Sequence, residues 1–248
     1  MAPLSRVFTV SCRSIGPESL AGRMLLRHWR YMPDSPDVDG GTLDQQTNLR
    51  KGLYPGVYKC KTFLMKDPFF FGYGSLVNRK THDYEQAHPA QITGWRRAWR
   101  RSPLRDLCYL TAVPDADCTI DGLIAAVPNS DWQTLDIRER AYLRQDATHQ
   151  VSHEVNHDPE VAIYAIKADA HQPPTPKNPI LLSYLDVVVQ GYLTEFGEDG
   201  VARFFNTTDG WHAPILNDRA KPVYPRAQSL SHAETALVDS YLTRYTET

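Results

Sequence analysis

The sequence predicts an α+β domain built around a small closed sheet. Two patterns carry this prediction: strand-like runs dominate the first half of the patterned region, and helical runs dominate the second. A third observation is the hydrophobic content of 42%, which can fill a sizeable core in 248 residues, beside an ordinary charged fraction of 23%. Global disorder is not expected, and the length suggests one compact domain with an appendage.

The appendage is the N-terminal part of the chain. Residues 1–31 carry five arginines against a single acid, Glu18, and PDSPDVDGG then has the composition of a linker. An organellar transit peptide has part of this composition. Met65, however, stands just before the first convincing strand. We therefore expect residues 1–64 to be a disordered extension or a start-site artefact, and residues 65–248 to form the domain.

The first convincing strand is the apolar run that begins at Pro68. Because this run is apolar on both faces, we expect it inside a covered sheet. Residues 107–114 and 120–128 flank the Asp-rich stretch DADC and predict a β-hairpin that turns there. Two further strands are expected at 149–155 and 160–167.

Three helices are expected after or between these strands. The first covers residues 129–145, with Ser130 as the N-cap of a capping box. The second begins at Pro179 and ends near Phe196, since apolar residues recur along it at helical spacing. The third begins at Ser231, which has a glutamate three positions later, again in capping-box position.

The charge balance and the cysteines bound the partners and the location. A formal net charge of -2 gives no long-range attraction to nucleic acid or to an anionic membrane, and no apolar run approaches the length that spans a bilayer. The four cysteines form neither a CxxC pair nor a secretory framework, which favours reduced thiols and a cytoplasmic location. Cys108 and Cys118 could face each other across the hairpin, but two free buried thiols are expected. The oligomeric state stays open.

The first chemical feature is FFFGYGSLVNR, residues 69–79, where a buried strand ends in a loop of small residues. Glycine at positions 72 and 74 permits positive φ and the close approach of a ligand, so successive backbone N–H groups can converge on an anion or a developing oxyanion. The spacing matches neither a phosphate loop nor a nucleophile elbow. The alternative is a tight turn in which Ser75 satisfies local backbone donors.

The second feature is Glu139. In the helix expected there, Trp132, Leu135, Glu139 and Tyr142 follow one another at helical spacing, which places a carboxylate on a stripe that packs against the core. Burial raises the pKa of a carboxyl and makes it useful as a proton shuttle near neutral pH. The alternatives are an ion pair with a neighbour such as Arg138 or Arg144, or a frayed helix that exposes the side chain.

Together, FGYGSL at 71–76 and LDIRERAY at 135–142 resemble the γ-glutamylcyclotransferase superfamily, with its ChaC-type, glutathione-specific and AIG2-like members. A third match is PILLSYLDVVVQGY, and the resemblance covers most of residues 68–196. It implies a small mixed β-barrel with flanking helices and a catalytic glutamate at Glu139. The substrate-binding residues that it implies are Phe71, Gly72, Tyr73, Gly74, Ser75, Leu76 and Tyr184.

The resemblance also implies a reaction. A γ-glutamyl amide is cleaved when its own α-amine attacks the γ-carbonyl, which releases 5-oxoproline and an amine, amino acid or peptide. No metal and no cofactor is expected, and the expected partner is a small γ-glutamyl compound. Glutathione, γ-glutamyl amino acids and γ-glutamylamines are not separated by these motifs. The rival hypothesis is a non-catalytic module that binds a small anion on the same fold.

Three other patterns were given structural interpretations. GWRRAWRR, residues 94–101, is interpreted as a strand with two tryptophan anchors and solvated arginines rather than as a nucleic-acid patch. His149, His153 and His157 lie in strand-like surroundings, where a four-residue spacing separates side chains by roughly 13 Å, so no metal site is assigned. NDRAKPVYPR, residues 217–226, could close over the leaving group, but a solvated connection is expected.

Overall fold

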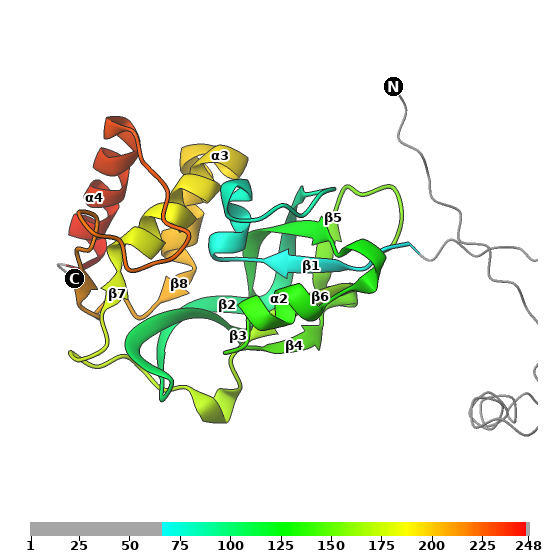
Figure 1. Ribbon diagram of the computed structural model, residues 1–248, viewed down its shortest axis with the longest axis horizontal. Helices are drawn as coiled ribbons and strands as arrows, with labels where there is room; N and C mark the ends of the chain where they lie inside the picture. Colours follow the sequence, from blue (N-terminus) through cyan, green and yellow to red (C-terminus); the bar gives the residue numbers. More distant parts are fainter. Residues whose placement is uncertain (1–65, 247–248) are drawn as a thin grey trace, which may run out of the picture. The chain divides into compact units, whose positions relative to one another are not determined.

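The computed structural model describes residues 66–246, so the expectations for residues 1–64, including Cys12 and Cys60, lie outside the described residues (Figure 1). The main sheet has seven strands in the order β4-β6-β1-β3-β2-β5, with β8 paired to β2. Their bounds are β1 Phe69–Gly72, β2 His88–Ser102, β3 Arg105–Ala126, β4 Leu143–Asp146, β5 Val151–His153, β6 Val161–Ala165 and β8 Thr208–Asp209. A second sheet pairs β7, Ile180–Leu181, with β9, Ile215–Leu216.

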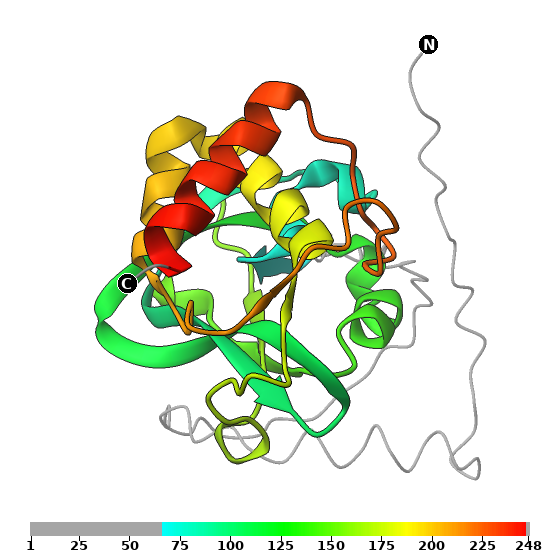
Figure 2. The same cartoon turned by 90° about the vertical axis from the view of Figure 1, so that its left-hand side faces the viewer.

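Within residues 66–246, three α-helices flank the sheet: α2 Gln133–Arg138, α3 Leu182–Asn206 and α4 His232–Thr246. Figure 1 and Figure 2 show α3 and α4 side by side, apart from α2. Five short 3-10 turns complete the described chain: η1 Ser75–Val77, η2 Arg79–Thr81, η3 Pro128–Ser130, η4 Thr148–Gln150 and η5 Ala168–Ala170. No helix within residues 66–246 has the length and apolar character needed to cross a membrane.

The predicted fold class is confirmed: the domain is α+β, with a mixed, curled sheet and flanking helices. Strand β1 runs antiparallel to β3 and parallel to β6, which makes the sheet mixed. The expectation of a closed sheet is wrong in one respect. Over the described residues the strand order ends at β4 and β5, which do not pair with each other. Both end strands are short, at four and three residues, and offer few backbone groups for closure, so the sheet is a half-barrel.

Strand β1 is covered on both faces, as its composition predicts. Phe69 and Phe71 belong to the core cluster that includes residues of α3 and α4. Phe70 belongs to a second cluster, which includes Leu135 of α2 and Tyr164 of β6. All three phenylalanines are buried, so helices on both sides hold the strand from which the glycine loop emerges.

The predicted hairpin with its turn at DADC is wrong. Residues 105–126 form the single long strand β3, and the turn lies instead between Ser102 and Arg105, where β2 meets β3. Opposite the DADC stretch the pairing register shifts between Thr93 and Trp95, and the intervening Gly94 has a φ of +89°. The Asp-rich residues therefore form a bulge that bends a continuous strand, a role that turn-like composition does not distinguish from a reversal.

The interpretation of GWRRAWRR is confirmed for its tryptophans and wrong for one arginine. Trp95 and Trp99 are buried on one face of β2. Arg97 lies between them on the same face and is 0% exposed. It is buried because neutral oxygens surround it: its guanidinium donates to the Asp121 carbonyl at 3.0 Å and to the Tyr192 hydroxyl at 2.8 Å. Side chains alternate between the two faces of a strand, and this alternation places Arg97 on the buried face of β2 despite its charge.

The helix predicted over residues 129–145 is much shorter. Helix α2 covers six residues, Glu139 is its C-cap, and strand β4 begins at Leu143. Ser130 lies in η3 rather than at the N-cap. The preceding residue, Asn129, has a φ of +57°, and the backbone therefore leaves the helical region before α2 starts. Residues 128–130 form the turn η3, so the capping box predicted at Ser130 is absent.

The two later helices agree better with the prediction. Helix α3 begins at Leu182 rather than at Pro179, because the two residues before it pair with β9 as strand β7. It continues past Phe196 to Asn206 through a kink at Gly197. The capping box at α4 is confirmed: the Glu234 N–H donates to the Ser231 hydroxyl at 3.2 Å, and the Ser231 N–H donates to the Glu234 carboxylate at 2.6 Å.

We expect Ser231→Ala to lower the free energy of unfolding by about 1 kcal/mol, because it removes a side-chain acceptor at the start of α4. Urea denaturation of the variant and the parent measures this difference. Ser240→Ala is the matched control, since that serine lies later on the same helix and its hydroxyl donates to Leu237 within the helix. Equal losses in the two variants would show that the cap contributes nothing specific.

Candidate functional site

A cavity of about 530 Å³ adjoins the glycine loop. Its walls come from the loop, the β2–β3 hairpin, the end of α2, the start of α3 and the 217–226 segment. The lining residues are Ser75, Leu104, Arg105, Leu107, Cys108, Tyr109, Leu110, Arg138, Glu139, Arg140, Ala141, Tyr142, Leu181, Tyr184, Tyr224, Pro225 and Arg226. A volume of this size suits a small-molecule ligand.

A smaller recess of about 30 Å³ adjoins this cavity. It is lined by residues 71–76 together with Leu110, Glu139, Tyr142 and Tyr164. Ser75, Leu110, Glu139 and Tyr142 line both spaces, so the recess and the cavity share a wall. The structure therefore places the loop and the acidic residue selected from the sequence around one continuous site.

Glu139 lies in this shared wall at the end of α2. Its N–H donates to the Leu135 carbonyl at 2.9 Å, which fixes its backbone as the last bonded position of the helix. Its side chain is 17% exposed and forms an ion pair with Arg138, with Nε and Oε1 3.1 Å apart. The pairing with Arg138 considered from the sequence is thus present, and it coexists with an inward position. Arg144 pairs with Asp136 instead.

Burial raises the pKa of the Glu139 carboxyl above its ordinary value, and the positive charges of Arg138 and Arg226 and a hydrogen bond from Arg138 oppose the shift. Arg138 is itself fixed: it donates to the Thr81 carbonyl at 2.9 Å and to the Ser75 hydroxyl at 3.3 Å. The carboxyl is therefore held toward the site by a cation that is anchored to the residues following the loop. A carboxyl with a raised pKa at the edge of a cavity is placed to exchange a proton with a bound ligand.

The raised pKa of Glu139 predicts a pH-dependent difference in stability between the parent and Glu139→Gln. The unfolded carboxyl ionises near its ordinary value of 4.5, whereas the folded one keeps its proton to a higher pH. The unfolded state then binds fewer protons over this interval, so the parent loses stability relative to the glutamine variant as the pH rises through the folded-state pKa. Urea denaturation of both proteins across this range measures the difference. A pH-independent difference would contradict the assigned direction.

The glycines of the loop serve close packing rather than positive φ. Neither Gly72 nor Gly74 is among the described glycines with a positive φ, so that expectation is wrong. A Cβ at Gly72 would lie 2.5 Å from the Leu76 Cβ, and a Cβ at Gly74 would lie 2.6 Å from the Tyr184 hydroxyl oxygen. Real Cβ contacts are not this short. Hydrogen at these positions lets the chain fold back at the strand end and lets Tyr184 reach the loop.

Tyr184, in the first turn of α3, lines the larger cavity. Its ring packs edge-on against Trp99 and Tyr224, with centroids 6.0 and 5.0 Å apart. Burial raises the pKa of its hydroxyl well above the ordinary value, and the backbone N–H of Ser75 opposes this shift. The tyrosine selected from the sequence therefore lies against the loop, from an element more than a hundred residues away.

The remaining loop residues differ in how they face the site. Tyr73 and Phe71 line the recess but their rings are buried in the core, and the Tyr73 hydroxyl donates to the Tyr164 carbonyl at 2.6 Å. Leu76 packs in the cluster beneath α2. Of the residues selected from the sequence, Ser75, Glu139 and Tyr184 line the larger cavity.

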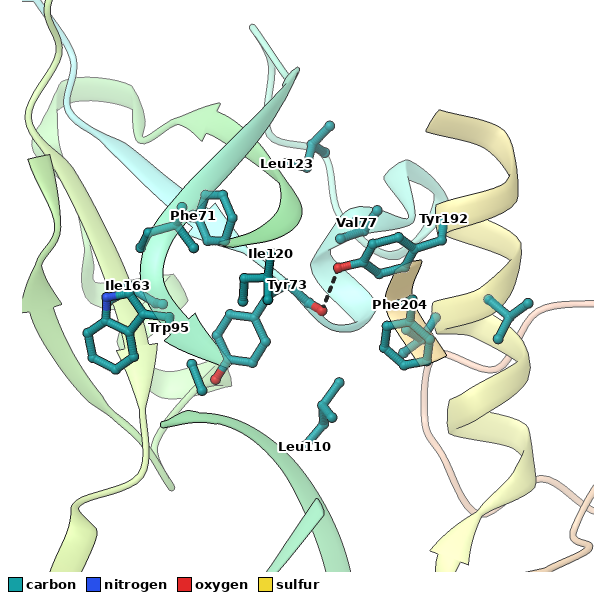
Figure 3. Packing of buried hydrophobic residues seen from close by; sticks show 14 of the residues in the cluster. Phe71, Tyr73, Val77, Trp95, Leu110, Ile120, Leu123, Ile163, Tyr192 and Phe204 are labelled. Carbon is teal, nitrogen blue, oxygen red and sulfur yellow. Dashed lines mark hydrogen bonds between the residues drawn. The ribbon is translucent and has the colours of Figure 1, made fainter. Parts of the chain in front are cut away.

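A buried polar group supports the loop from behind. The Tyr192 hydroxyl of α3 lies 3.0 Å from the Tyr73 carbonyl and 2.7 Å from the Asp121 carbonyl, and it accepts from Arg97. Figure 3 shows the contact between Tyr192 and the Tyr73 backbone, with Phe204 packed beside it. The Arg97 guanidinium also lies over the Tyr192 and Phe204 rings, 5.2 and 5.0 Å from their centroids. This cluster fixes the strand end against α3, and sequence reasoning missed it.

The 217–226 segment is expected to be a solvated connection, and Pro225 and Arg226 are exposed, but the segment also has a second role. Tyr224, Pro225 and Arg226 line the larger cavity. The segment is tied down by Asp218, whose carboxylate accepts from the Ser183 N–H and the Val223 N–H, both at 2.8 Å. Figure 2 shows its orange residues passing the start of α3 on the way to α4.

Two further wall residues were not selected from the sequence. Tyr142 follows Glu139 by three residues, and its buried hydroxyl donates to the Leu110 carbonyl at 3.0 Å. Cys108, from β3, donates to the Asn178 carbonyl, and burial raises the pKa of its thiol to about 11. Cys108 and Cys118 are both free and buried, as expected. The stripe that drew attention to Glu139 contained the signal for Tyr142.

Residues 66–246 contain no group of three or more histidine, cysteine, aspartate or glutamate side chains able to hold a metal ion. His153 lies in β5 and His149 in η4. The chemical groups of the cavity wall are a carboxyl, arginines, tyrosine hydroxyls, a serine and one thiol. Such a wall can bind a polar molecule and move a proton.

One comparison with known proteins matches a family model over part of the chain. Residues 70–183 match the family model described as gamma-glutamyl cyclotransferase, AIG2-like. A search of curated protein sequences gave no significant match. Among solved structures, the chain resembles YkqA from Bacillus subtilis at 16% identity and a TM-score of 0.44, with 58% of this chain and 56% of YkqA covered. The chain thus spans little more than half of YkqA.

Two other solved structures are matched over nearly their whole length. One is described as gamma-glutamyl cyclotransferase, with 14% identity, a TM-score of 0.44, and coverage of 71% of this chain and 99% of the other. The second is a yeast gamma-glutamyl cyclotransferase described as specific to glutathione, with 17% identity, a TM-score of 0.38, and coverage of 73% and 97%.

Proposed function

We propose that this protein is a γ-glutamylcyclotransferase, because residues 70–183 match the family model described as gamma-glutamyl cyclotransferase, AIG2-like. It cleaves a γ-glutamyl amide by intramolecular attack and releases 5-oxoproline and an amine, amino acid or peptide. One observation carries the proposal: Glu139, a carboxyl with a raised pKa, lies in the wall shared by the glycine-loop recess and the larger cavity.

The loop edge where the recess meets the larger cavity accounts for the γ-glutamyl head. In this proposal the backbone of residues 73–76 holds the head and offers N–H donors to the oxygen of the tetrahedral intermediate; one such donor contributes about 3 kcal/mol in other enzymes. Tyr184, which lies against Gly74, hydrogen-bonds the substrate. Because the nucleophile and the electrophile belong to one molecule, holding it folded supplies an effective molarity of roughly 10⁵ to 10⁸ M.

Glu139 is the proton shuttle in this proposal. Its carboxylate accepts a proton from the substrate α-ammonium, and the free amine then attacks the γ-carbonyl carbon. The new C–N bond closes the five-membered ring, and the amide C–N bond breaks as Glu139 returns the proton to the departing nitrogen. The attacking nitrogen then gives up its second proton, through Glu139, to the released amine, so that the ring nitrogen ends as a lactam N–H and the amine leaves as an ammonium. One carboxyl thus serves both steps, and the pair with Arg138 keeps it in place between them.

The test is the release of 5-oxoproline from a panel of γ-glutamyl compounds: glutathione, γ-glutamyl amino acids and γ-glutamylamines. We expect 5-oxoproline and the free amine in equal amounts, unaffected by a chelator. Turnover that is lost on chelation would instead indicate a metal-dependent hydrolase. Binding of the compounds without any product would favour the rival module that binds a small anion. The free thiols of Cys108 and Cys118 suit a reducing compartment, and we propose a cytoplasmic location.

A further inference from the structure

The walls of the larger cavity carry an unbalanced charge. Four arginines line it, Arg105, Arg138, Arg140 and Arg226, against one acidic residue, Glu139. Arg138 forms the ion pair with Glu139. Within the part of the chain that the structure describes, no carboxylate lies at ion-pair distance from the other three. The site therefore carries a net positive charge. Arg105, Arg140 and Arg226 are exposed guanidinium groups without an ion-pair partner among the described residues, and the charge of Arg226 acts on Glu139 at longer range.

These three arginines come from separate elements. Arg105 starts β3 at the hairpin turn, Arg140 follows the end of α2, and Arg226 ends the 217–226 segment. Arg105 is oriented by its own strand, since its Nε donates to the Tyr109 hydroxyl at 3.0 Å and its guanidinium lies over that ring. The segment that carries Arg226 is fixed by Asp218. Three walls thus present a cation to the same space.

The position of these arginines relative to the recess determines which part of a bound substrate they contact. The glycine loop lines the recess. None of the three arginines, Arg105, Arg140 and Arg226, lines it. If the γ-glutamyl head lies against the loop at the mouth of the recess, as in the proposed function, the leaving group extends into the rest of the larger cavity. A cationic leaving group would be repelled there, and a neutral one would leave the three exposed guanidinium groups without an anionic partner. Carboxylates match the geometry and charge of arginine.

We propose that the outer cavity selects γ-glutamyl compounds whose leaving amine carries two carboxylates, with Arg105, Arg140 and Arg226 as the specificity-determining residues. This inference rests on the proposed function, because it assigns the leaving group to the larger cavity. The class is represented by γ-glutamyl-glutamate. Its leaving group, glutamate, has an α-carboxylate and a side-chain carboxylate, and the part of the cavity wall outside the recess has guanidinium groups that can pair with them.

The test uses three substrates of nearly equal shape. The leaving group is glutamate in the first, glutamine in the second and glutamine amide in the third, with two, one and no carboxylates. We expect KM for 5-oxoproline release to rise about three- to tenfold at each step, the range of a partly exposed arginine–carboxylate contact. Raising the salt from 0.1 to 1 M should compress the series, since the screening length falls from about 10 to about 3 Å.

Single variants identify the arginines responsible. We expect Arg140→Gln and Arg226→Gln each to reduce the preference for γ-glutamyl-glutamate over the substrate that releases glutamine amide by about threefold or more. The preference is the ratio of the two KM values, and kcat should stay unchanged. Arg100→Gln is the matched control: it removes the same charge from β2, and Arg100 does not line the cavity. A preference that falls equally in the control would assign the effect to overall charge and overturn the proposal.

A binding measurement separates this inference from the proposed function. Calorimetry of Glu139→Gln with the same three compounds reports recognition without turnover. Binding that weakens along the series while the parent releases no 5-oxoproline would support the charged subsite and overturn the cyclotransferase activity. Turnover of all three compounds with equal KM would support the activity and overturn the subsite.

Discussion

Glu139→Gln should lower kcat for 5-oxoproline release by about 10² to 10⁴, the usual contribution of a positioned proton donor and acceptor. Glutamine keeps the shape of glutamate and a hydrogen-bonding oxygen. The ion pair with Arg138 therefore becomes a hydrogen bond to an uncharged amide, while the proton shuttle is lost. The rising limb of the pH–rate profile, which reports the ionisation of this carboxyl in the parent, should disappear in the variant. Steady-state kinetics of both proteins across pH measure both effects.

The control for this prediction is Glu154→Gln. Glu154 is exposed and does not line the cavity or the recess, so its substitution removes the same charge far from the chemistry. A variant at 139 that is folded, binds substrate and keeps the parental kcat would remove Glu139 from the mechanism. Near-ultraviolet circular dichroism establishes that each variant is folded before its kinetics are compared.

Gly74→Ala should lower kcat/KM by about tenfold to a hundredfold and the free energy of unfolding by about 1–3 kcal/mol. The added Cβ would stand 2.6 Å from the Tyr184 hydroxyl oxygen, so either the loop or the tyrosine must move. Tyr184 has little freedom because its ring is packed against Trp99 and Tyr224. Kinetics and urea denaturation of the variant measure the two losses.

A double-mutant cycle with Tyr184→Phe tests the stated cause. Removing the hydroxyl relieves the close contact, so Gly74→Ala should cost less stability in the Tyr184→Phe background than in the parent. The stability should recover while the activity does not, since the hydroxyl proposed to hold the substrate is absent. Strictly additive losses of stability would show that the methyl group collides with something other than Tyr184.

The parts of the fold that follow from local pattern were predictable. The apolar run FFFG lies between two layers because each face of the strand is apolar, and α4 begins at Ser231 because the capping box is local. The bulge at DADC was mistaken for a turn, since turn-forming residues also suit a bend within a strand. Pairing over 22 residues of β3 is a tertiary choice that composition does not contain.

The site was predictable where one residue broke a pattern. Glu139 was conspicuous because a charge stood on an apolar stripe, and the structure places it at the C-cap of a shorter helix, still in the cavity wall. Arg97 broke the same kind of pattern but was interpreted as solvated, because its neutral partners lie about 25 and 95 residues away and leave no local trace. Arg226 was missed for the same reason.

The anchoring of residues 217–226 extends the part of the chain that is needed for a complete site. The family match ends at residue 183, yet Tyr184, Tyr192 and Arg226 follow it, and all three build or support the site. A recombinant fragment cut at the end of the match would discard one wall and the support beneath the glycine loop. Gene fusions and truncations intended to retain this site need the chain at least to the end of that segment.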